Sequence, residues 1–511
     1  MSVIRFLADR RANFGMMFAL IAPAFMLSVG IAIDLTTLST AKAKLQTSLD
    51  AAVLAASRLR DANVSRDQVF QDFLTANLGG VGAIHSVDAK LELDNGLNYI
   101  RTTGSASADV KLTFLRYPLD ISKINVKASA FEATNELEVA LVLDNTGSMG
   151  ADRMKALRDA ATAMVGILEN AASQNRIVRG ALVPFVATVN IKGEGFSYGW
   201  IDTLAQSPLH GANFVKRADG TPVNHFELFH ELGVDWKGCV EARPAPYNLS
   251  DAAPDPTVPS TLFVPAFAPD NPGAAAKSPN DSAKWNNSYI DDTFGTADAA
   301  MKKDVSRYFS GAKVKFIDEK GPRSTGPNYA CATPIVPLTS DFKKLKDAIK
   351  GMTYWEGGGT NVSEGLAWGL RVLSPGEPYT QGRPFKSHGV SKVAVVFTDG
   401  ENTVFGASSQ PYNTSDYGAY GFLDAGRFGT TNRTTALTNV NTWTLSTCKA
   451  LKDQDVQIFT VLLGADTAAN RKLYSECASH PENYYPTNDV SELKSVFQKI
   501  GSVVASLTLT Q

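Results

Sequence analysis

Three oxygen-bearing side chains directly follow the most strand-like segment of this chain. Residues 137–143, LEVALVL, form an apolar run rich in strand-forming residues, and Asp144, Thr146 and Ser148 come immediately after it. Carboxylate and hydroxyl oxygens are the ligands that Mg²⁺ and Mn²⁺ prefer, whereas zinc sites favour His and Cys. The spacing therefore predicts the first ligand loop of a hard-cation site.

Two further oxygen ligands come from distant parts of the sequence. Asp399 ends a second apolar run in VVFTDGEN, and Thr360 lies on the glycine-rich stretch YWEGGGTNVSEG just before a predicted helix. Mg²⁺ is the expected ion, with Mn²⁺ or Ca²⁺ as alternatives. The predicted metal ligands are Asp144, Thr146, Ser148, Thr360 and Asp399.

This ligand set favours recognition over catalysis. Two carboxylates roughly neutralise a divalent ion, and neutral hydroxyls leave it electrophilic enough to accept an acidic side chain from a protein partner at an open coordination position. No His or Cys accompanies the five residues as a base or nucleophile. We therefore expect no enzymatic activity and no small-molecule substrate.

The ligands need strand ends that meet at one edge of a sheet. From residue 136 onward, strand-like and helix-like segments alternate, which predicts an α/β domain with a doubly wound, mostly parallel six-stranded sheet. Ligands collect at the carboxyl ends of parallel strands, so the three loops are expected to converge there. The alternation stops between about residues 192 and 333, where Pro- and Gly-rich sequence indicates a long insertion.

The four cysteines, with no C-x-x-C spacing, fit two disulfides in an oxidising compartment. Proximity in the sequence suggests Cys239–Cys331, which would close the insertion at its base, and Cys448–Cys477. Four buried free thiols are the alternative.

The first 135 residues have a different organisation. Residues 14–33 contain no charge over a length that spans a bilayer, and Leu45, Leu49 and Val53 continue one face of a helix beyond them. A second short helix over about 65–80 and a β-meander over about 85–131, with turn chemistry at 94–96, complete a small α+β domain. We expect a cytoplasmic tip and transmembrane anchor at 1–37, this membrane-proximal domain at 38–135, and the sheet domain at 136–511.

The apolar run is interpreted as an uncleaved anchor, with a removed signal peptide as the alternative. Arg5, Arg10 and Arg11 precede it and Lys42 and Lys44 follow it, which favours a cytoplasmic N-terminus only slightly. Lys and Arg number 49 against 51 Asp and Glu, and no block of like charge marks a nucleic-acid surface. Nucleic acid is therefore not an expected partner.

The D-x-T-x-S of residues 144–148, the later GGGTN and the strand-terminal TDG resemble the metal-ion-dependent adhesion site (MIDAS) of von Willebrand factor type A domains, over about residues 136–505. The resemblance implies that the hydroxyls of Thr146, Ser148 and Thr360 bind the metal directly, while Asp144 and Asp399 act largely through water. Thr146 stands where that family usually has serine and keeps the hydroxyl. The insertion departs from the minimal domain.

Residues 10–57 resemble the start of TadE/TadG-like proteins of the tight-adherence (Flp) pilus system, in which a membrane helix runs into an LQ-x-x-LDAAxLAA helix. The fifth residue after Gly15 is Leu20 and not the glutamate of prepilin processing, so we do not expect a pilin. Together the resemblances imply a single-pass protein of the bacterial inner membrane with most of its chain in the periplasm or envelope. It would bind pilus or envelope proteins in pilus assembly or anchoring; the alternative is a pilus-independent surface adhesin.

Other interpretations have weaker support. A haloacid-dehalogenase phosphatase needs an aspartate where Thr146 stands, and a metal-chelatase accessory subunit would not need an anchor. His225, Glu227 and His230 lack the H-E-x-x-H spacing of a zinc site and are expected to be structural. Two acidic residues and two aromatic residues flank the proposed site and are expected to be solvated or to anchor loops: Glu356, Glu401, Tyr354 and Trp355.

Overall fold

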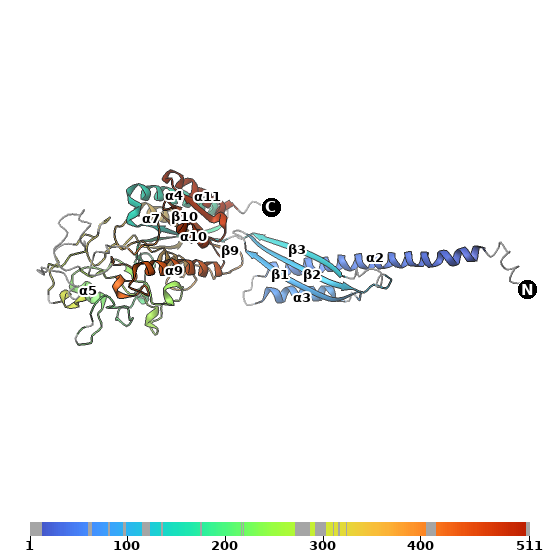
Figure 1. Cartoon of the computed structure of the whole chain (residues 1–511), viewed down its shortest axis with the longest axis horizontal. Coiled ribbons are helices and arrows are strands. Elements are labelled where there is room, and N and C mark those ends of the chain that lie inside the picture. Colours follow the sequence, from blue (N-terminus) through green and yellow to red (C-terminus); the bar gives the residue numbers. More distant parts are fainter. Residues whose placement is uncertain are drawn as a thin grey trace, which may run out of the picture. The chain divides into compact units, whose positions relative to one another are not determined.

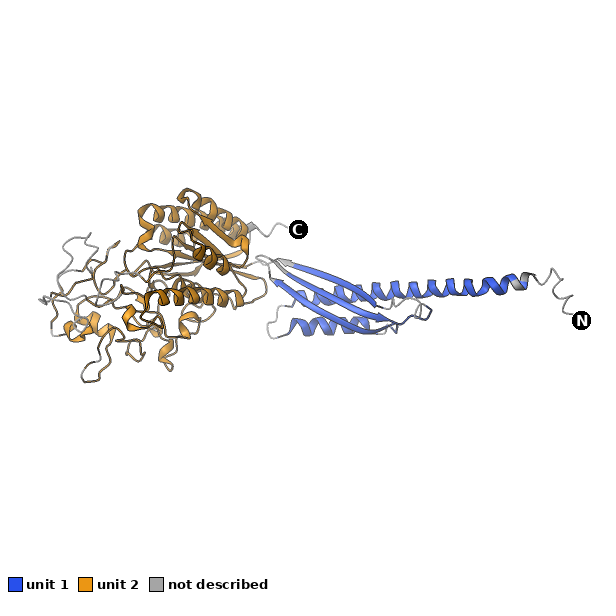
Figure 2. Cartoon of the chain, viewed as in Figure 1, with its two compact units in different colours: residues 1–134 blue, residues 135–511 orange. Residues whose placement is uncertain are grey.

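The computed structural model divides the chain into two compact units, Met1–Thr134 and Asn135–Gln511 (Figure 2). Each unit has its own hydrophobic core. The structure describes residues 13–59, 64–79, 82–95, 99–114, 123–133, 136–173, 176–215, 217, 219–270, 287–291, 303–309, 311–314, 317–322, 324–404 and 415–506.

The first unit is built around one long helix. Helix α2 (Asn13–Ser57) runs without interruption through Pro23, and it contains the predicted apolar run and the predicted amphipathic segment (Figure 1). It is a candidate membrane span by length and composition, over Met17–Ser57. Arg5, Arg10 and Arg11, which bear on its orientation, lie outside the described residues.

Helix α3 (Arg66–Leu78) and a three-stranded antiparallel sheet complete the first unit. The sheet has the order β1-β2-β3, with β1 at Ile84–Asn95, β2 at Tyr99–Val110 and β3 at Lys123–Ala133. The predicted meander is therefore present, although Gly96 of its predicted turn lies outside the described residues. Leu45, Leu49 and Val53 of α2 are buried against the sheet, as their spacing predicts.

Within the described residues, the second unit has a mixed sheet of eight strands and not the predicted six. Five strands are parallel, in the order β11-β10-β9-β4-β5, and three short strands pair antiparallel at the β5 side. Strands of two to four residues are too short to show a periodic pattern, which explains the miscount. The strands are β4 (Glu136–Asp144), β5 (Ile177–Phe185), β6 (Val189–Asn190), β7 (Cys239–Val240), β8 (Val336–Thr339), β9 (Val390–Thr398), β10 (Val456–Leu463) and β11 (Tyr484–Thr487).

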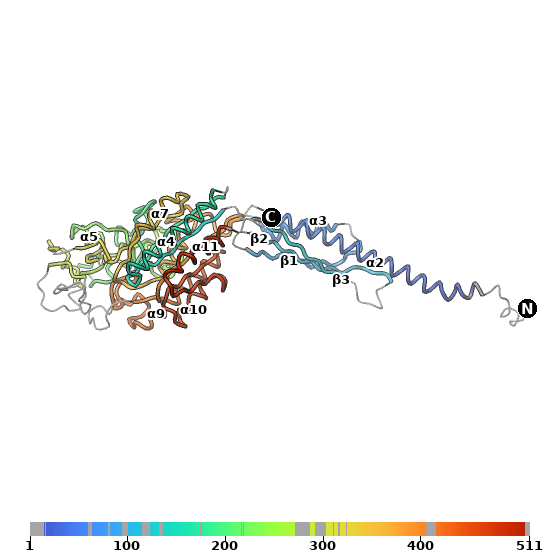
Figure 3. The backbone as a smooth tube through the Cα atoms, turned by 90° about the horizontal axis from the view of Figure 1, so that it is seen from above, coloured from blue at the N-terminus to red at the C-terminus, as the bar shows by residue number. Residues whose placement is uncertain are grey.

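Two helical layers make this sheet doubly wound. Helices α4, α7 and α11 pack together in one layer, and α9 and α10 belong to the other (Figures 1 and 3). Helix α8 packs against α9 in that second layer. Five apolar residues of α4 recur at helical spacing and are all buried: Met154, Leu157, Ala161, Met164 and Leu168. The helices are α4 (Gly150–Ala172), α5 (His225–Glu231), α7 (Phe342–Gly351), α8 (Val362–Leu373), α9 (Arg433–Asp453), α10 (Ala468–Cys477) and α11 (Leu493–Ser506).

The described parts of the predicted insertion, residues 192–333, contain the short helix α5 and the two-residue strand β7 between longer irregular segments. Both predicted disulfides are present. Cys239–Cys331 joins β7 to a residue 92 positions later, near the end of the insertion, and Cys448–Cys477 ties α9 to α10. The alternative of four free thiols is wrong.

Candidate metal centre

Asp144 lies at the carboxyl end of β4, the parallel strand that lies between β9 and β5. Its side chain is fully buried. Carboxylate Oδ1 accepts a hydrogen bond from the backbone N–H of Thr146 at 2.8 Å, and Oδ2 accepts one from the hydroxyl of Thr398 at 2.7 Å. These contacts fix the carboxylate and hold the following loop in a tight turn against it.

The two predicted hydroxyls extend this network to the neighbouring strand. The Oγ atoms of Thr146 and Ser148 are 3.0 Å apart, and the hydroxyl of Ser148 donates to Oδ1 of Asp399 at 2.7 Å. Asp399 follows β9, which pairs directly with β4. Four of the five predicted ligands therefore belong to one hydrogen-bonded cluster at one edge of the sheet.

A basic side chain also reaches this cluster. Arg153, in the first turns of α4, donates from Nη1 to Oδ2 of Asp399 at 2.7 Å. The carboxylate side chain of Asp399 is fully buried, whereas the arginine side chain is 40% exposed. Arg153 therefore offsets part of the acidic charge from the solvent side of the cluster.

Burial and the nearby carboxylate of Asp399 both disfavour the charged form of Asp144. The pKa of Asp144 is raised to about 7, chiefly by burial and secondly by the negative charge of Asp399. Hydrogen bonds from Thr146 and Thr398 act against this rise. A cation placed between the carboxylates would relieve both unfavourable contributions.

Thr360 lies on the third predicted loop, but its side chain is not joined to the other four ligands by a hydrogen bond among the described residues. Its backbone N–H donates to the hydroxyl of Thr403 at 2.8 Å, and its carbonyl accepts from the N–H of Thr403 at 2.9 Å. The structure thus places Thr360 beside the loop after β9 through its backbone.

The three glycines before Thr360 have a clear conformational role. Gly357, Gly358 and Gly359 have φ values of 100°, 75° and 86°, which L-residues with a side chain rarely adopt. A Cβ on Gly357 would also lie 2.0 Å from the hydroxyl of Tyr329. The GGG sequence is therefore needed to route this loop past the insertion toward the strand ends.

The loop after β4 and the loop that carries Thr360 are hydrogen-bonded to each other, once between backbones and once through the side chain of Asn145. The N–H of Trp355 donates to the carbonyl of Asn145 at 2.8 Å, and the amide of Asn145 donates to the carbonyl of Thr353 at 3.0 Å. A Cβ on Gly147 would lie 3.1 Å from the Cα of Glu356. The convergence of the three loops that the sheet order predicts is therefore observed.

The donor set fits a hard divalent cation. The cluster offers two buried carboxylates and two hydroxyls that can turn their lone pairs toward an ion, which suits Mg²⁺. Among the residues that the structure describes, no group of three or more His, Cys, Asp and Glu side chains is placed to hold a metal. Any metal here would therefore depend on the hydroxyls of Thr146 and Ser148.

The other residues singled out in the sequence have structural surroundings. His225 is buried in α5, and its Nδ1 lies 2.7 Å from the carbonyl oxygen of Pro265. Trp355 is buried against Val186 and the insertion, so it anchors the loop. Glu401 is exposed, and Tyr354 and Glu356 are partly exposed beside the cluster.

Three residues in the cluster escaped the sequence analysis. Thr398 holds Asp144, Arg153 holds Asp399, and Asn145 links the first loop to the third. The available signal for Thr398 was its place at the carboxyl end of β9, beside the end of β4 that carries Asp144. The contact of Arg153 with Asp399 could not be predicted, because sequence spacing does not show where the first turn of α4 lies relative to β9.

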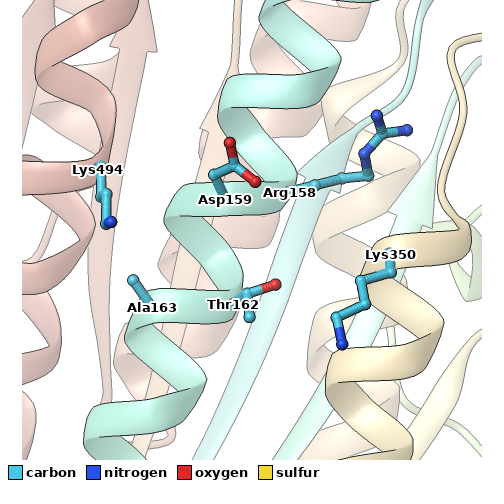
Figure 4. Close-up of a pocket in the computed structure, with 6 residues that line it drawn as sticks. All are labelled: Arg158, Asp159, Thr162, Ala163, Lys350 and Lys494. Carbon is cyan, nitrogen blue, oxygen red and sulfur yellow. The ribbon is translucent and has the colours of Figure 1, made fainter.

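A shallow hollow between α4, α7 and α11 lies along the helical layer and not at the strand ends (Figure 4). Arg158 there donates to the carbonyl of Met352 at 2.8 Å. The hollow shares no residue with the cluster described above. Its lining residues are Arg158, Asp159, Thr162, Ala163, Lys350 and Lys494.

Comparison with known families agrees with both resemblances. The TadE/G-like Flp pilus-assembly domain (Tad) matches residues 13–60, and the von Willebrand factor type A domain matches residues 324–499. The second match includes Thr360 and Asp399. Asp144, Thr146 and Ser148 lie outside the matched range, but their strand β4 is hydrogen-bonded to β9 within the same sheet. The chain thus carries a Tad-like segment and a von Willebrand factor type A domain.

Solved structures with a related arrangement include several pilus proteins. The von Willebrand factor domain of the pilus tip protein Mfa5 from Porphyromonas gingivalis is 10% identical, with 74% of this chain and 98% of that chain covered and a TM-score of 0.33. The pilus adhesin SpaC from Lactobacillus rhamnosus GG is 10% identical in its open conformation, with 82% and 34% covered and a TM-score of 0.32. This chain therefore spans about a third of the length of SpaC. No curated protein matches the sequence.

Proposed function

We propose that this chain is a membrane-anchored, extracytoplasmic protein that binds other proteins through a divalent cation during assembly or anchoring of a Flp, or tight-adherence, pilus. The Tad-like segment at residues 13–60 supports the connection with pilus assembly. The apolar part of α2 supports a single-pass anchor in the inner membrane, with the remainder of the chain in the periplasm or envelope.

One observation carries the binding mechanism. Two buried carboxylates, Asp144 and Asp399, are linked through Thr146, which bonds Asp144 by its backbone N–H and Ser148 by its hydroxyl, and through Ser148, whose hydroxyl bonds Asp399. These four side chains would hold Mg²⁺, and Thr360 on the adjacent loop would contribute its hydroxyl. The bound ion would supply Lewis acidity for an acidic side chain of the partner.

The chain's own residues prepare this site before any partner arrives. Thr398 orients the Asp144 carboxylate, and Asn145 keeps the first and third loops together. The side chain of Ser148 is exposed on the solvent side of the cluster, where a partner can approach. The role that we assign is binding without catalysis, because the cluster offers ligands and an arginine but no general base of the imidazole or thiolate type.

The proposal is tested by replacing Asp144 in the organism that makes the protein. We expect Asp144→Asn to reduce the amount of surface pilin recovered by shearing. The control Asp152→Asn, which replaces an exposed acidic residue in the first turn of α4, should leave it unchanged. Membrane levels of both variants are measured by immunoblot, so that loss of protein is separated from loss of binding. Normal piliation with Asp144→Asn at normal protein levels would contradict the proposal.

The alternative is a surface adhesin that acts without a pilus. The same pair of variants separates the two functions. If Asp144→Asn leaves pilin recovery intact but lowers the attachment of cells to a surface, the metal centre serves adhesion directly. The von Willebrand factor type A domain by itself is compatible with both functions.

A further inference from the structure

An exposed phenylalanine of the first unit lies against the apolar part of α2. Phe114, four residues after the end of β2, is 45% exposed, and its ring packs over Gly30. A Cβ on Gly30 would lie 2.5 Å from Cγ of this ring. Only glycine therefore allows the ring to approach the helix so closely.

The position of Phe114 is fixed by a buried carboxylate. Asp34, one turn further along α2, accepts hydrogen bonds from the backbone N–H groups of Thr113 and Phe114, at 3.0 Å and 2.6 Å. Asp34 is 1% exposed. A buried carboxylate needs hydrogen-bond donors, so these two bonds hold the segment after β2 at this level of the helix.

The level at which Phe114 lies coincides with the end of the apolar run. The uncharged stretch ends at Ile33, and Gly30 is three residues before it, which is about 4.5 Å along a helix. Interfacial apolar groups enter a bilayer by about 5–10 Å, to the boundary between headgroups and acyl chains. Val29 and Ile33, on the adjoining helix surface, are 44% and 52% exposed, so Phe114 extends an apolar surface that already exists.

We propose that Phe114 inserts into the headgroup–acyl boundary of the bilayer and so seats the first unit directly on the membrane surface. The partner is the phospholipid bilayer, and the inference rests on the membrane anchor of the proposed function. Asp34 and Gly30 are positioning residues, because one holds the backbone of the segment and the other admits the ring.

Phe131 provides a matched control within the same sheet. It is also an exposed phenylalanine, at 62%, but it lies near the far end of β3, opposite Arg101. Lys123, at the membrane-proximal start of β3, is eight residues away, or about 26 Å along a strand. Phe131 should therefore remain in water when Phe114 is in contact with lipid.

The experiment uses the full-length chain in phosphatidylcholine vesicles that contain lipids brominated near the headgroup end of the acyl chains. Three tryptophan variants are compared with the parent chain: Phe114→Trp, Phe131→Trp and Val29→Trp. All six native tryptophans follow residue 135, so the parent supplies a common background. The aromatic replacement at position 114 keeps the ring that packs on Gly30.

We expect brominated lipid to quench the added fluorescence of Phe114→Trp and Val29→Trp but not that of Phe131→Trp. Quenching of Val29→Trp without quenching of Phe114→Trp would overturn the inference and leave the anchor intact. Absence of quenching for both would overturn the anchor as well. Equal quenching of Phe114→Trp and Phe131→Trp would also overturn it, since the sheet would then contact lipid along its whole length.

Discussion

Buried acidic side chains have different partners at the two ends of the central sheet. At the amino end, Glu138 lies on β4 between Arg179 and Lys392, its register partners on the two neighbouring strands. Arg179 Nη2 is 2.9 Å from Glu138 Oε1, and the ammonium group of Lys392 donates to the other carboxylate oxygen. Glu136, at the start of the same strand, likewise has Arg179 and Arg383 as basic partners.

At the carboxyl end, the same strands carry two buried carboxylates with much less compensation. Asp144 is paired with hydroxyl and N–H donors only, and Asp399 with a hydroxyl and the partly exposed Arg153. One strand therefore ends in a closed ion-pair network on one side and in an acidic, hydroxyl-lined cluster on the other. This difference is the one expected if the amino end serves stability and the carboxyl end holds the cation of the proposed function.

The largest loss in the free energy of unfolding is expected from a substitution at the amino end of the sheet. Glu138→Ala leaves the buried ammonium of Lys392 without its carboxylate, and removing one partner of a buried pair costs about 3–5 kcal/mol. Urea unfolding followed by tryptophan fluorescence measures the free energy of unfolding of the second unit. Asp399→Asn in chelator is the matched comparison and should cost less, since it relieves repulsion with Asp144. Equal losses from both variants would remove the contrast between the two ends.

Mg²⁺ should stabilise the parent chain through the carboxyl end alone. A ligand at a hundred times its Kd adds about 2.7 kcal/mol to the free energy of unfolding, and we expect a gain of this order on adding saturating Mg²⁺ to chelator-treated protein. Asp144→Asn should lose the gain, and Asp152→Asn should keep it. The Mg²⁺-dependent shift of the urea midpoint measures this, and an undiminished shift for Asp144→Asn would place the metal elsewhere.

Arg153 should compete weakly with the cation for Asp399. Its ion pair is 40% exposed on the arginine side, and such pairs contribute up to about 1 kcal/mol, or about a fivefold change in affinity. Arg153→Gln is therefore expected to raise the affinity for Mg²⁺ by no more than about this factor in calorimetric titration. A decrease in affinity would mean that the arginine supports the metal site.

The smallest effect is expected for Thr146→Ser, which keeps the hydroxyl that faces Ser148. Calorimetric titration should give the parent's Mg²⁺ affinity for this variant and a lower affinity for Thr146→Val, which keeps the shape but loses the oxygen. If Thr146→Val bound Mg²⁺ as well as the parent did, the hydroxyl would not be a ligand.

The features predicted from the sequence are those with a strong local signal. The apolar run before Asp144 predicts β4, and the spacing of Leu45, Leu49 and Val53 predicts the buried face of α2. The position of Asp144 and Asp399 at strand ends predicts that they lie close together. These predictions succeed because a buried strand or helix face imposes its period on the sequence.

The features that escaped prediction depend on contacts between distant residues. Strands β6 and β7 have two residues each and exist only because the chain folds back beside β5. The contact of Arg153 with Asp399 joins residues 246 apart. The basic partners of Glu138 were also not predicted, because the register of parallel strands cannot be read from one sequence.

Diffraction from crystals soaked in Mn²⁺ tests the central claim most directly. We predict one strong anomalous peak at the carboxyl end of β4 and β9, within coordination distance of Ser148 and Thr146 and next to Asp144 and Asp399. An anomalous map with no peak there at saturating Mn²⁺, or with its strongest peak away from these side chains, would contradict the assignment of this cluster as a metal centre.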